Sequence, residues 1–129
     1  MKVREIMKKP IVAEPEISVK EIAEIMAKNK IGSVILVARK KVVGIITESD
    51  LVNKFIVSDK LPSQVKAKDI MSSDVVTIPD NENVEYAAYT MAKKGIEHLP
   101  VITKGRLVGI LTANDILRAT PELSMNGLF

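Results

Sequence analysis

Two short segments place a threonine three residues before an aspartate, directly after an apolar run. They span Gly44 to Leu51 and Gly109 to Ile116, with Gly, Thr and Asp at the same spacings. The pattern is typical of a strand that runs into a helix, because Thr is a favoured N-cap residue and Asp stabilises the first helical turn. The same groups, a hydroxyl, a carboxylate and backbone N–H groups, can hold phosphate and ribose. Each segment is therefore a helix cap, a ligand site, or both.

The sequence leaves the choice between cap and ligand open for Asp50 and Asp115. One carboxylate oxygen can accept a backbone N–H while the other accepts a ribose hydroxyl, so the two roles are compatible. For Thr47 and Thr112 we favour capping as the sole role, and for His98 we favour a hydrogen-bonded strand residue over a phosphate ligand. Lys93, Lys94 and Arg106 are candidates to neutralise phosphate, although for each of them we favour a solvated cationic face.

Other reactive groups are scarce. The chain has no cysteine and a single histidine, which argues against thiol catalysis and a multi-His or Cys-ligated metal centre. Glu48 and Asp50 suggest an acid/base pair, but the second copy has Ala113 in place of Glu48, and no nucleophile with a partnered base is visible. We therefore expect no enzymatic activity, no catalytic cofactor and no metal.

Composition narrows the class of ligand and the location. A formal net charge of +3 and a pI near 9.1 favour anionic ligands without naming one. Aromatic residues make up 3% of the chain, so a stacking platform for single-stranded nucleic acid is poorly supplied. No apolar run approaches the length of a membrane span or a signal-peptide core. We expect a soluble, cytoplasmic protein.

The apolar pattern of the first half of the chain predicts five elements in the order strand, helix, strand, strand, helix. Four apolar residues at helical spacing, Val19, Ile22, Ala23 and Met26, predict one buried helix face. The predicted elements are an extended piece over 10–15, a helix capped by Ser18 and ended by Gly32, strands over 33–37 and 42–47, and a helix from Glu48 to about Val57.

The second half repeats this order. Ala67 to Met71 echoes Val3 to Met7, Val75 to Pro79 echoes the extended piece, and from Met26 and Met91 onward the offset is constant at 91 − 26 = 65 residues. The sequence predicts an α/β (α+β) fold of two β-α-β-β-α motifs, at 1–60 and 61–119, packed sheet to sheet about a pseudo-two-fold axis with a ligand cleft at the seam. We interpret Gly44 and Gly109 as room for close packing, and Met7, Met26, Met71 and Met91 as core filler.

These residues resemble a known family: the chain looks like a tandem pair of cystathionine-β-synthase (CBS) domains. The resemblance rests on Ile6-Met7 and Ile70-Met71, the helices that end near Met26 and Met91, the strand His98 to Val101, and both Gly-x-x-Thr-x-x-Asp segments. It covers about residues 1–119. It implies a regulatory module that binds AMP, ADP, ATP or another adenosyl compound in clefts between the motifs, and a homodimer of such modules.

The resemblance also assigns roles to residues. The motif aspartates, Asp50 and Asp115, would hold the ribose hydroxyls, and the threonines would lie near ribose and phosphate. The extended pieces would line the base pocket. The second half follows the family pattern more closely, so we expect the Asp115 cleft to be filled first. The full set of expected ligand residues is Thr112, Asp115, Thr77, Val76, His98, Pro100, Thr47, Asp50, Val12 and Ala13.

The functional prediction is an adenine-nucleotide sensor that acts through a change in conformation or dimer geometry on an unknown regulated protein. One alternative is a protein-interaction or structural module without a physiological nucleotide, with the apolar residues of the tail at 120–129 as contact surface. A weaker alternative is nucleic-acid binding, suggested by the basic charge.

Overall fold

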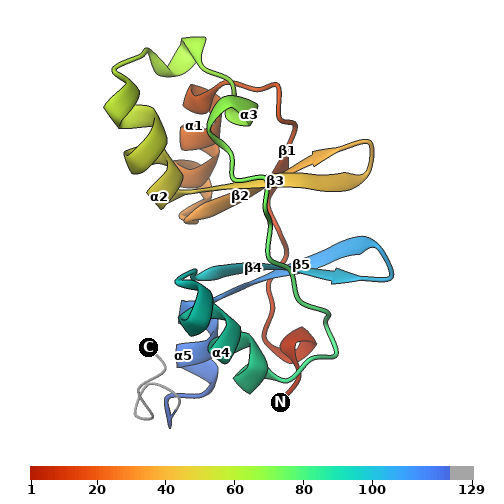
Figure 1. Ribbon diagram of the computed structural model, residues 1–129. Coiled ribbons are helices and arrows are strands. Elements are labelled where there is room, and N and C mark those ends of the chain that lie inside the picture. The colour runs from red at the N-terminus through yellow and green to blue at the C-terminus, as the bar shows by residue number, and fades with distance from the viewer. Residues whose placement is uncertain (123–129) are drawn as a thin grey trace. The chain divides into compact units, whose positions relative to one another are not determined.

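The computed structural model describes residues 1–122 (Figure 1). The apolar tail residues that the sequence suggested as a contact surface, Leu123, Met125, Leu128 and Phe129, lie outside the described residues. Two compact units form: unit 1 joins Met1–Pro10 to Val76–Phe129, and unit 2 is Ile11–Val75. Each unit is described by itself.

Unit 2 combines a three-stranded sheet with helices on one side of it (Figure 1). The strand order is β1-β2-β3, with β1 parallel to β2 and β2 antiparallel to β3. Its elements are β1 (Val12–Ala13), α1 (Val19–Asn29), β2 (Ser33–Ala38), β3 (Lys41–Thr47), α2 (Glu48–Asp50), η2 (Leu51–Phe55), η3 (Ile56–Ser58), η4 (Pro62–Gln64) and α3 (Ala67–Ile70).

Unit 1 packs two helices and an N-terminal turn against an antiparallel pair of strands (Figure 1). The N-terminal turn belongs here because Val3 is fully buried in this core and its N–H bonds Glu82 O at 2.9 Å. The elements are η1 (Val3–Glu5), α4 (Val84–Lys94), β4 (His98–Thr103), β5 (Arg106–Thr112) and α5 (Ala113–Ala119).

The mixed α/β (α+β) class is confirmed, and the compact units divide the chain differently from the sequence repeats. The opening residues of the first repeat pack in unit 1, while Ala67 to Ile70, which open the second repeat, form α3 in unit 2. The repeat boundaries at 1–60 and 61–119 stay a prediction.

Helix α1 begins as predicted and ends earlier. The Ser18 hydroxyl accepts a hydrogen bond from the Glu21 N–H at 3.1 Å, which caps the helix. The helix ends at Asn29, and Lys30 adopts the left-handed conformation (φ 53°), so the prediction that Gly32 ends it was wrong. Helix α4 uses Gly95 (φ 65°) at the equivalent position, where glycine is the unstrained choice.

The buried face of α1 is narrower than predicted. Val19, Ile22 and Met26 are buried against the sheet, but Ala23 is exposed and Ile25 is partly buried instead. On α4 the predicted face is complete: the four residues Val84, Ala87, Ala88 and Met91 are all buried.

The two sheets differ because of one proline. In unit 2 the Ile35 N–H bonds Ile11 O at 3.0 Å, which ties β1 to β2. The equivalent residue in unit 1 is Pro100, which has no N–H to donate. The predicted strand before β4 is therefore reduced to an isolated bridge between Ile78 and Val101.

The helical segment that follows β3 in unit 2 extends through Ser58, close to the predicted end. Its hydrogen-bonding pattern changes along the way, from α over Glu48–Asp50 to π over Leu51–Phe55 and 3₁₀ over Ile56–Ser58. The counterpart in unit 1, α5, is α-helical throughout. The repeat in sequence thus does not extend to the geometry of these helices.

The two motif glycines make room for methionines. A Cβ on Gly109 would lie 2.5 Å from the Met7 Sδ, and a Cβ on Gly44 would lie 2.5 Å from the Met71 Sδ. Both methionines pack against the core of their unit. The interpretation of these residues as close-packed glycines and core filler is confirmed.

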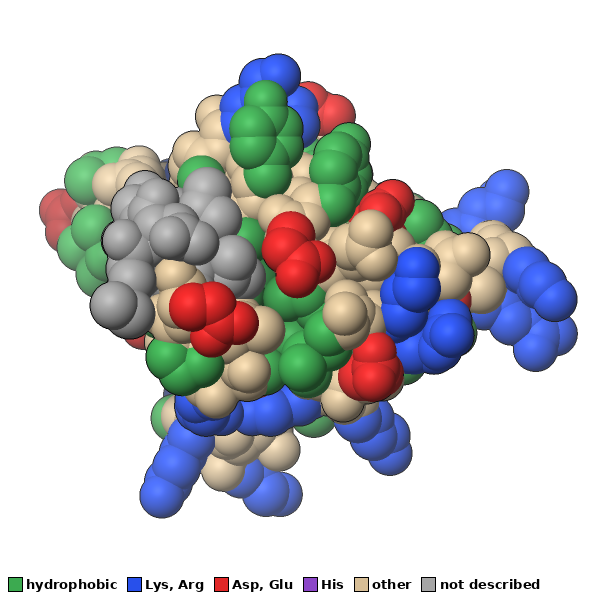
Figure 2. Space-filling model, turned by 90° about the horizontal axis from the view of Figure 1, so that it is seen from below, with side chains coloured by type: hydrophobic (Ala, Val, Ile, Leu, Met, Phe, Trp, Pro, Cys, Tyr) green, Lys and Arg blue, Asp and Glu red, His purple; other side chains and the backbone are tan. Residues whose placement is uncertain are grey.

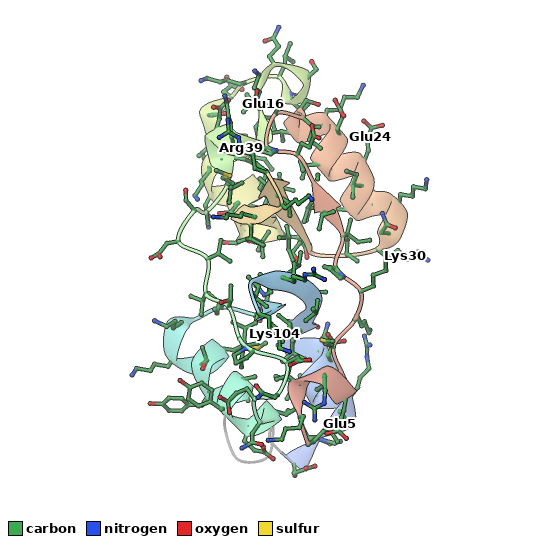
Figure 3. All side chains as sticks on the ribbon, turned by 90° about the vertical axis from the view of Figure 1, so that its right-hand side faces the viewer. Glu5, Glu16, Glu24, Lys30, Arg39 and Lys104 are labelled. Atoms are coloured by element: carbon green, nitrogen blue, oxygen red, sulfur yellow. The ribbon has the colours of Figure 1, made fainter. Side chains whose placement is uncertain are left out.

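The tip of each β-hairpin carries basic side chains and positive φ angles (Figure 3). Arg39 and Lys40 lie at φ 52° and 64° between β2 and β3, and Lys104 and Gly105 lie at 53° and 75° between β4 and β5. Mirror-image turns of this kind match the twist of the flanking strands. In the first hairpin two non-glycine residues, Arg39 and Lys40, adopt positive φ angles, which costs conformational energy. Both side chains are exposed.

We predict that Gly109→Ala lowers the free energy of unfolding by about 1–3 kcal/mol, because the added methyl group overlaps Met7. Urea denaturation measures the loss. In a Met7→Ala background the same substitution should cost less, since the overlapping side chain is gone. An equal cost in both backgrounds would contradict this packing.

Candidate ligand-binding site

In unit 1, Asp115 is buried at the junction of β5 and α5. The Thr112 N–H donates to Asp115 Oδ2 at 2.9 Å, and the Asp115 N–H donates to the Thr112 hydroxyl at 3.2 Å. This reciprocal pair is the predicted capping box. The Asp115 side chain is 3% exposed, so its charge requires partners inside the unit.

The other oxygen of Asp115 is paired with cations. Lys8 Nζ lies 3.1 Å from Asp115 Oδ1, and Arg118 Nη1 lies 4.0 Å from the same atom. The Lys8 N–H bonds Ile110 O at 3.0 Å and the Ile110 N–H bonds Lys8 O at 2.9 Å, so the backbone of Lys8 is fixed beside β5. The Lys8 side chain is 59% exposed. The carboxylate thus has an oxygen committed to the backbone and an oxygen covered by a flexible ammonium.

In unit 2, Asp50 has the same inner contact. The Thr47 N–H donates to Asp50 Oδ2 at 3.0 Å, and the Thr47 hydroxyl donates to that oxygen at 3.4 Å. The register of β2 and β3 places Ser33 opposite Thr47, just as His98 stands opposite Thr112. The strand-to-helix junction is therefore duplicated in structure as well as in sequence.

The outer oxygen of Asp50 has two close partners. The Ser72 hydroxyl donates to Asp50 Oδ1 at 3.0 Å, and Lys54 Nζ lies 3.1 Å from the same oxygen. Lys54 also donates to the Ser72 hydroxyl at 3.2 Å. These three groups form a closed triangle. Ser72 is the counterpart of Lys8, because its backbone is bridged to Ile45 as Lys8 is bridged to Ile110.

The remaining expected residues of unit 1 follow β4 and the segment beside it. His98, at the start of β4, is partly buried and paired in register with Thr112, while Pro100 is paired with Ile110. Val76 packs against the core, and Thr77 is exposed. The bridge from Ile78 to β4 places this segment on the opposite edge of β4 from β5. Unit 1 therefore holds six of the expected residues: Thr112, Asp115, Thr77, Val76, His98 and Pro100.

The remaining four expected residues lie in unit 2. Val12 and Ala13 form β1 and pair with Ile35 and Leu36 of β2. Val12 is 49% exposed. Thr47 and Asp50 are separated from this strand by the width of β2, because β2 lies between β1 and β3.

Sequence reasoning missed the partners of the two carboxylates. Arg118 and Lys54 could have been found, because they stand three and four residues after their aspartates on the same helical segment. Lys8 and Ser72 come from segments far away in sequence, so no local spacing points to them. Lys93, suggested as a phosphate neutraliser, lies over the Tyr89 ring, with Nζ 5.8 Å from the ring centroid.

A second group of charges involves Glu16. Lys66 and Lys68 lie 2.8 Å and 3.0 Å from its carboxylate oxygens, and hydrogen bonds from these two lysines lower the pKa of Glu16. The bond to Glu16 raises the pKa of Lys66. All three side chains are about half exposed, which is typical of a surface ion-pair network.

Residues 1–122 contain neither a metal-ligand cluster nor a membrane-spanning helix. No three His, Asp or Glu side chains come together in a way that could hold a metal ion. Among the helices of these residues, none combines the length and the hydropathy needed to cross a bilayer.

A family model described as CBS domain matches the chain twice, at residues 3–56 and 67–122. An uncharacterized protein of Methanopyrus kandleri is 43% identical over 115 residues, which are 88% of this chain and 59% of that protein. The chain thus spans about three fifths of the length of this curated relative.

Solved structures of CBS proteins resemble the chain closely. The CBS domain pair of protein MJ0100, in complex with 5′-methylthioadenosine and S-adenosyl-L-methionine, has a TM-score of 0.85 and 33% identity, and covers 95% of this chain and 98% of that one. A hexameric CBS-CP12 protein from bloom-forming cyanobacteria has a TM-score of 0.86 and 27% identity, with coverage of 96% and 74%.

We predict that Thr112→Val destabilises the protein more than Thr47→Val does. The Thr112 hydroxyl accepts the Asp115 N–H, a cap bond worth about 1 kcal/mol, whereas the Thr47 hydroxyl donates a longer bond to its aspartate. Chemical denaturation of the two matched variants measures the difference. Equal losses, or a larger loss for Thr47→Val, would contradict it.

Proposed function

The chain belongs to the CBS domain family, and from this premise we propose that it binds an adenine nucleotide at Asp115 and reports the binding to a partner protein. The observation that carries the proposal is that the two oxygens of the Asp115 carboxylate have different partners. Oδ2 is held by the Thr112 N–H, and Oδ1 is covered by the ammonium of Lys8, which is largely exposed and can move. A ribose diol can replace that ammonium without disturbing the cap.

In this proposal the other residues of unit 1 surround the ligand. Thr112 would lie near ribose and phosphate, and His98, which is paired with Thr112 across the sheet, would contact the phosphate. Val76, Thr77 and Pro100 line the adenine pocket. The ligand is AMP, ADP or ATP.

Adenosyl binding has support from a relative. The CBS domain pair of MJ0100 is described in complex with 5′-methylthioadenosine and S-adenosyl-L-methionine. Both compounds share the adenine and the ribose of AMP and differ at the 5′ position. The group that binds the ribose is therefore the part of the site that we expect all such ligands to share.

A second site at Asp50 is proposed to be weaker. A ligand there must separate the Asp50 carboxylate from both the Ser72 hydroxyl and the Lys54 ammonium, which also bond each other. Val12 and Ala13 would line its base pocket. We therefore expect the Asp115 site to fill first.

Regulation is proposed to work by population shift. A ligand favours the conformation that it binds more tightly, by no more than its difference in affinity for the two conformations. We propose that the responding assembly is a homodimer that acts on another protein in the cytoplasm. The hexameric CBS-CP12 protein is an example of oligomerisation among relatives.

Nucleic-acid binding has less support. The basic hairpin tip at Arg39 to Lys41 is exposed, but on the face shown in Figure 2 acidic and basic side chains are interspersed with hydrophobic ones. A duplex binder instead needs a continuous row of cations along its phosphate contacts.

We predict that AMP, ADP or ATP raises the melting temperature, and that Asp115→Asn weakens this binding about 10- to 100-fold by removing a charge-assisted bond to the ribose. Isothermal titration calorimetry measures the affinity. The asparagine keeps an oxygen for the Thr112 N–H, so the fold is preserved. Asp50→Asn is the matched control and should leave the tighter site unchanged.

Two results would overturn the proposal. A thermal-shift panel of AMP, ADP, ATP, 5′-methylthioadenosine and S-adenosyl-L-methionine without any response would favour the interaction module without a nucleotide. Unchanged affinity in Asp115→Asn would remove Asp115 from the site.

A further inference from the structure

The outer oxygen of Asp115, Oδ1, lies near two cations, although the carboxylate carries a single negative charge. Asp115 carries one negative charge, while Lys8 at 3.1 Å and Arg118 at 4.0 Å each carry a positive one. The carboxylate is almost fully buried, and both cations are more than half exposed. The immediate surroundings of Oδ1 therefore have a net positive charge.

Lys8 cannot leave this neighbourhood even when its ammonium is displaced. Two backbone hydrogen bonds to Ile110, at 2.9 and 3.0 Å, fix its Cα beside β5. A ligand that takes Oδ1 with its ribose hydroxyls removes the counter-ion of Lys8 but leaves the ammonium within side-chain reach of the ligand. What the ligand carries beyond its ribose then decides whether that charge is paired again.

The two chemical classes of adenosyl ligand differ at this point. A nucleotide carries a phosphate next to the ribose, which can pair with the displaced ammonium. Methylthioadenosine is neutral there, and S-adenosylmethionine carries a positive sulfonium, with its carboxylate further out, beyond two methylene groups and on a carbon that also bears an ammonium. Lys54 in unit 2 is in a different position, because it keeps its bond to the Ser72 hydroxyl when Asp50 is taken.

We propose that Lys8 is a specificity-determining residue that makes the Asp115 site select phosphate-bearing adenosyl ligands over neutral and cationic ones. This inference rests on the proposed function, since it requires an adenosyl ligand at Asp115. The selection acts in two ways: Lys8 competes with the ribose of every ligand for Oδ1, and it pairs again most directly with ligands that carry a phosphate next to the ribose.

The test compares AMP with 5′-methylthioadenosine in the full chain. By calorimetry at fixed, low salt, Lys8→Gln should weaken AMP binding about 2- to 5-fold, the size expected for a charge pair with an exposed member. Binding of methylthioadenosine should stay unchanged or become tighter, because its competitor for Oδ1 is gone. The ratio of the two affinities is the diagnostic quantity.

Two variants serve as controls. Lys8→Arg keeps the charge and should keep the preference for AMP. Lys9→Gln removes an adjacent exposed lysine and the same formal charge, and should leave both affinities unchanged. Raising the salt concentration should weaken AMP binding in the wild type more than in Lys8→Gln, because screening acts on the charge pair.

The outcomes separate the two proposals. If Lys8→Gln weakens both ligands equally, or leaves AMP affinity unchanged, Lys8 does not set specificity, while the adenosyl site itself stands. If Lys9→Gln has the same effect as Lys8→Gln, general charge explains the result and the inference also fails. If the wild type binds neither ligand, the proposed function fails first.

Discussion

The hydrogen bond from a threonine N–H to a buried aspartate three residues later is the constraint on which each unit depends. It joins the last residue of a strand to the first turn of a helix, at 2.9 Å in unit 1 and 3.0 Å in unit 2. A carboxylate that caps a helix from inside must have its second oxygen satisfied as well. The structure therefore has to bring a donor to that oxygen, and it does so differently in the two units.

The donors come from an exchange of segments, in which the opening residues of each sequence repeat pack in the unit formed mainly by the other repeat. Lys8 belongs to the opening of the first repeat yet neutralises Asp115 in the second, and Ser72 belongs to the second repeat yet bonds Asp50 in the first. Only Ser72 is neutral, so unit 2 adds Lys54 from the helical segment that follows Asp50. The duplicated cap thus has two electrostatic environments, and the proposed difference in ligand selection follows from them rather than from the cap.

Local patterns predicted most of the fold. The helices, the hairpins and both caps were predictable, because their signals depend on residues close together in sequence. Examples are the periodicity of Val84 to Met91 and the repeated Gly-x-x-Thr-x-x-Asp segments. The reduction of the predicted strand before β4 to a single bridge was missed, because it depends on a residue of the neighbouring strand, Pro100, which has no N–H to donate. The end of α1 was missed because Lys30 takes a conformation usual for glycine. The contacts of Lys8 and Ser72 were beyond reach because they depend on which segments pack in which unit.

The exchange of segments between the units also offers a way for ligand binding in one unit to affect the other. Lys8 lies just before Pro10, where the chain leaves unit 1 for β1 of unit 2, and Ser72 lies just before Val75, where it returns. Each of the two chain segments that connect the units therefore bonds one of the two carboxylates through Lys8 or Ser72. A ligand that displaces either side chain acts on a segment that continues into the other unit. The coupling available is bounded by the difference in the ligand's affinity for the two conformations. Under the proposed function, such a module suits graded regulation, in which a modest free energy shifts an equilibrium that a partner protein reads.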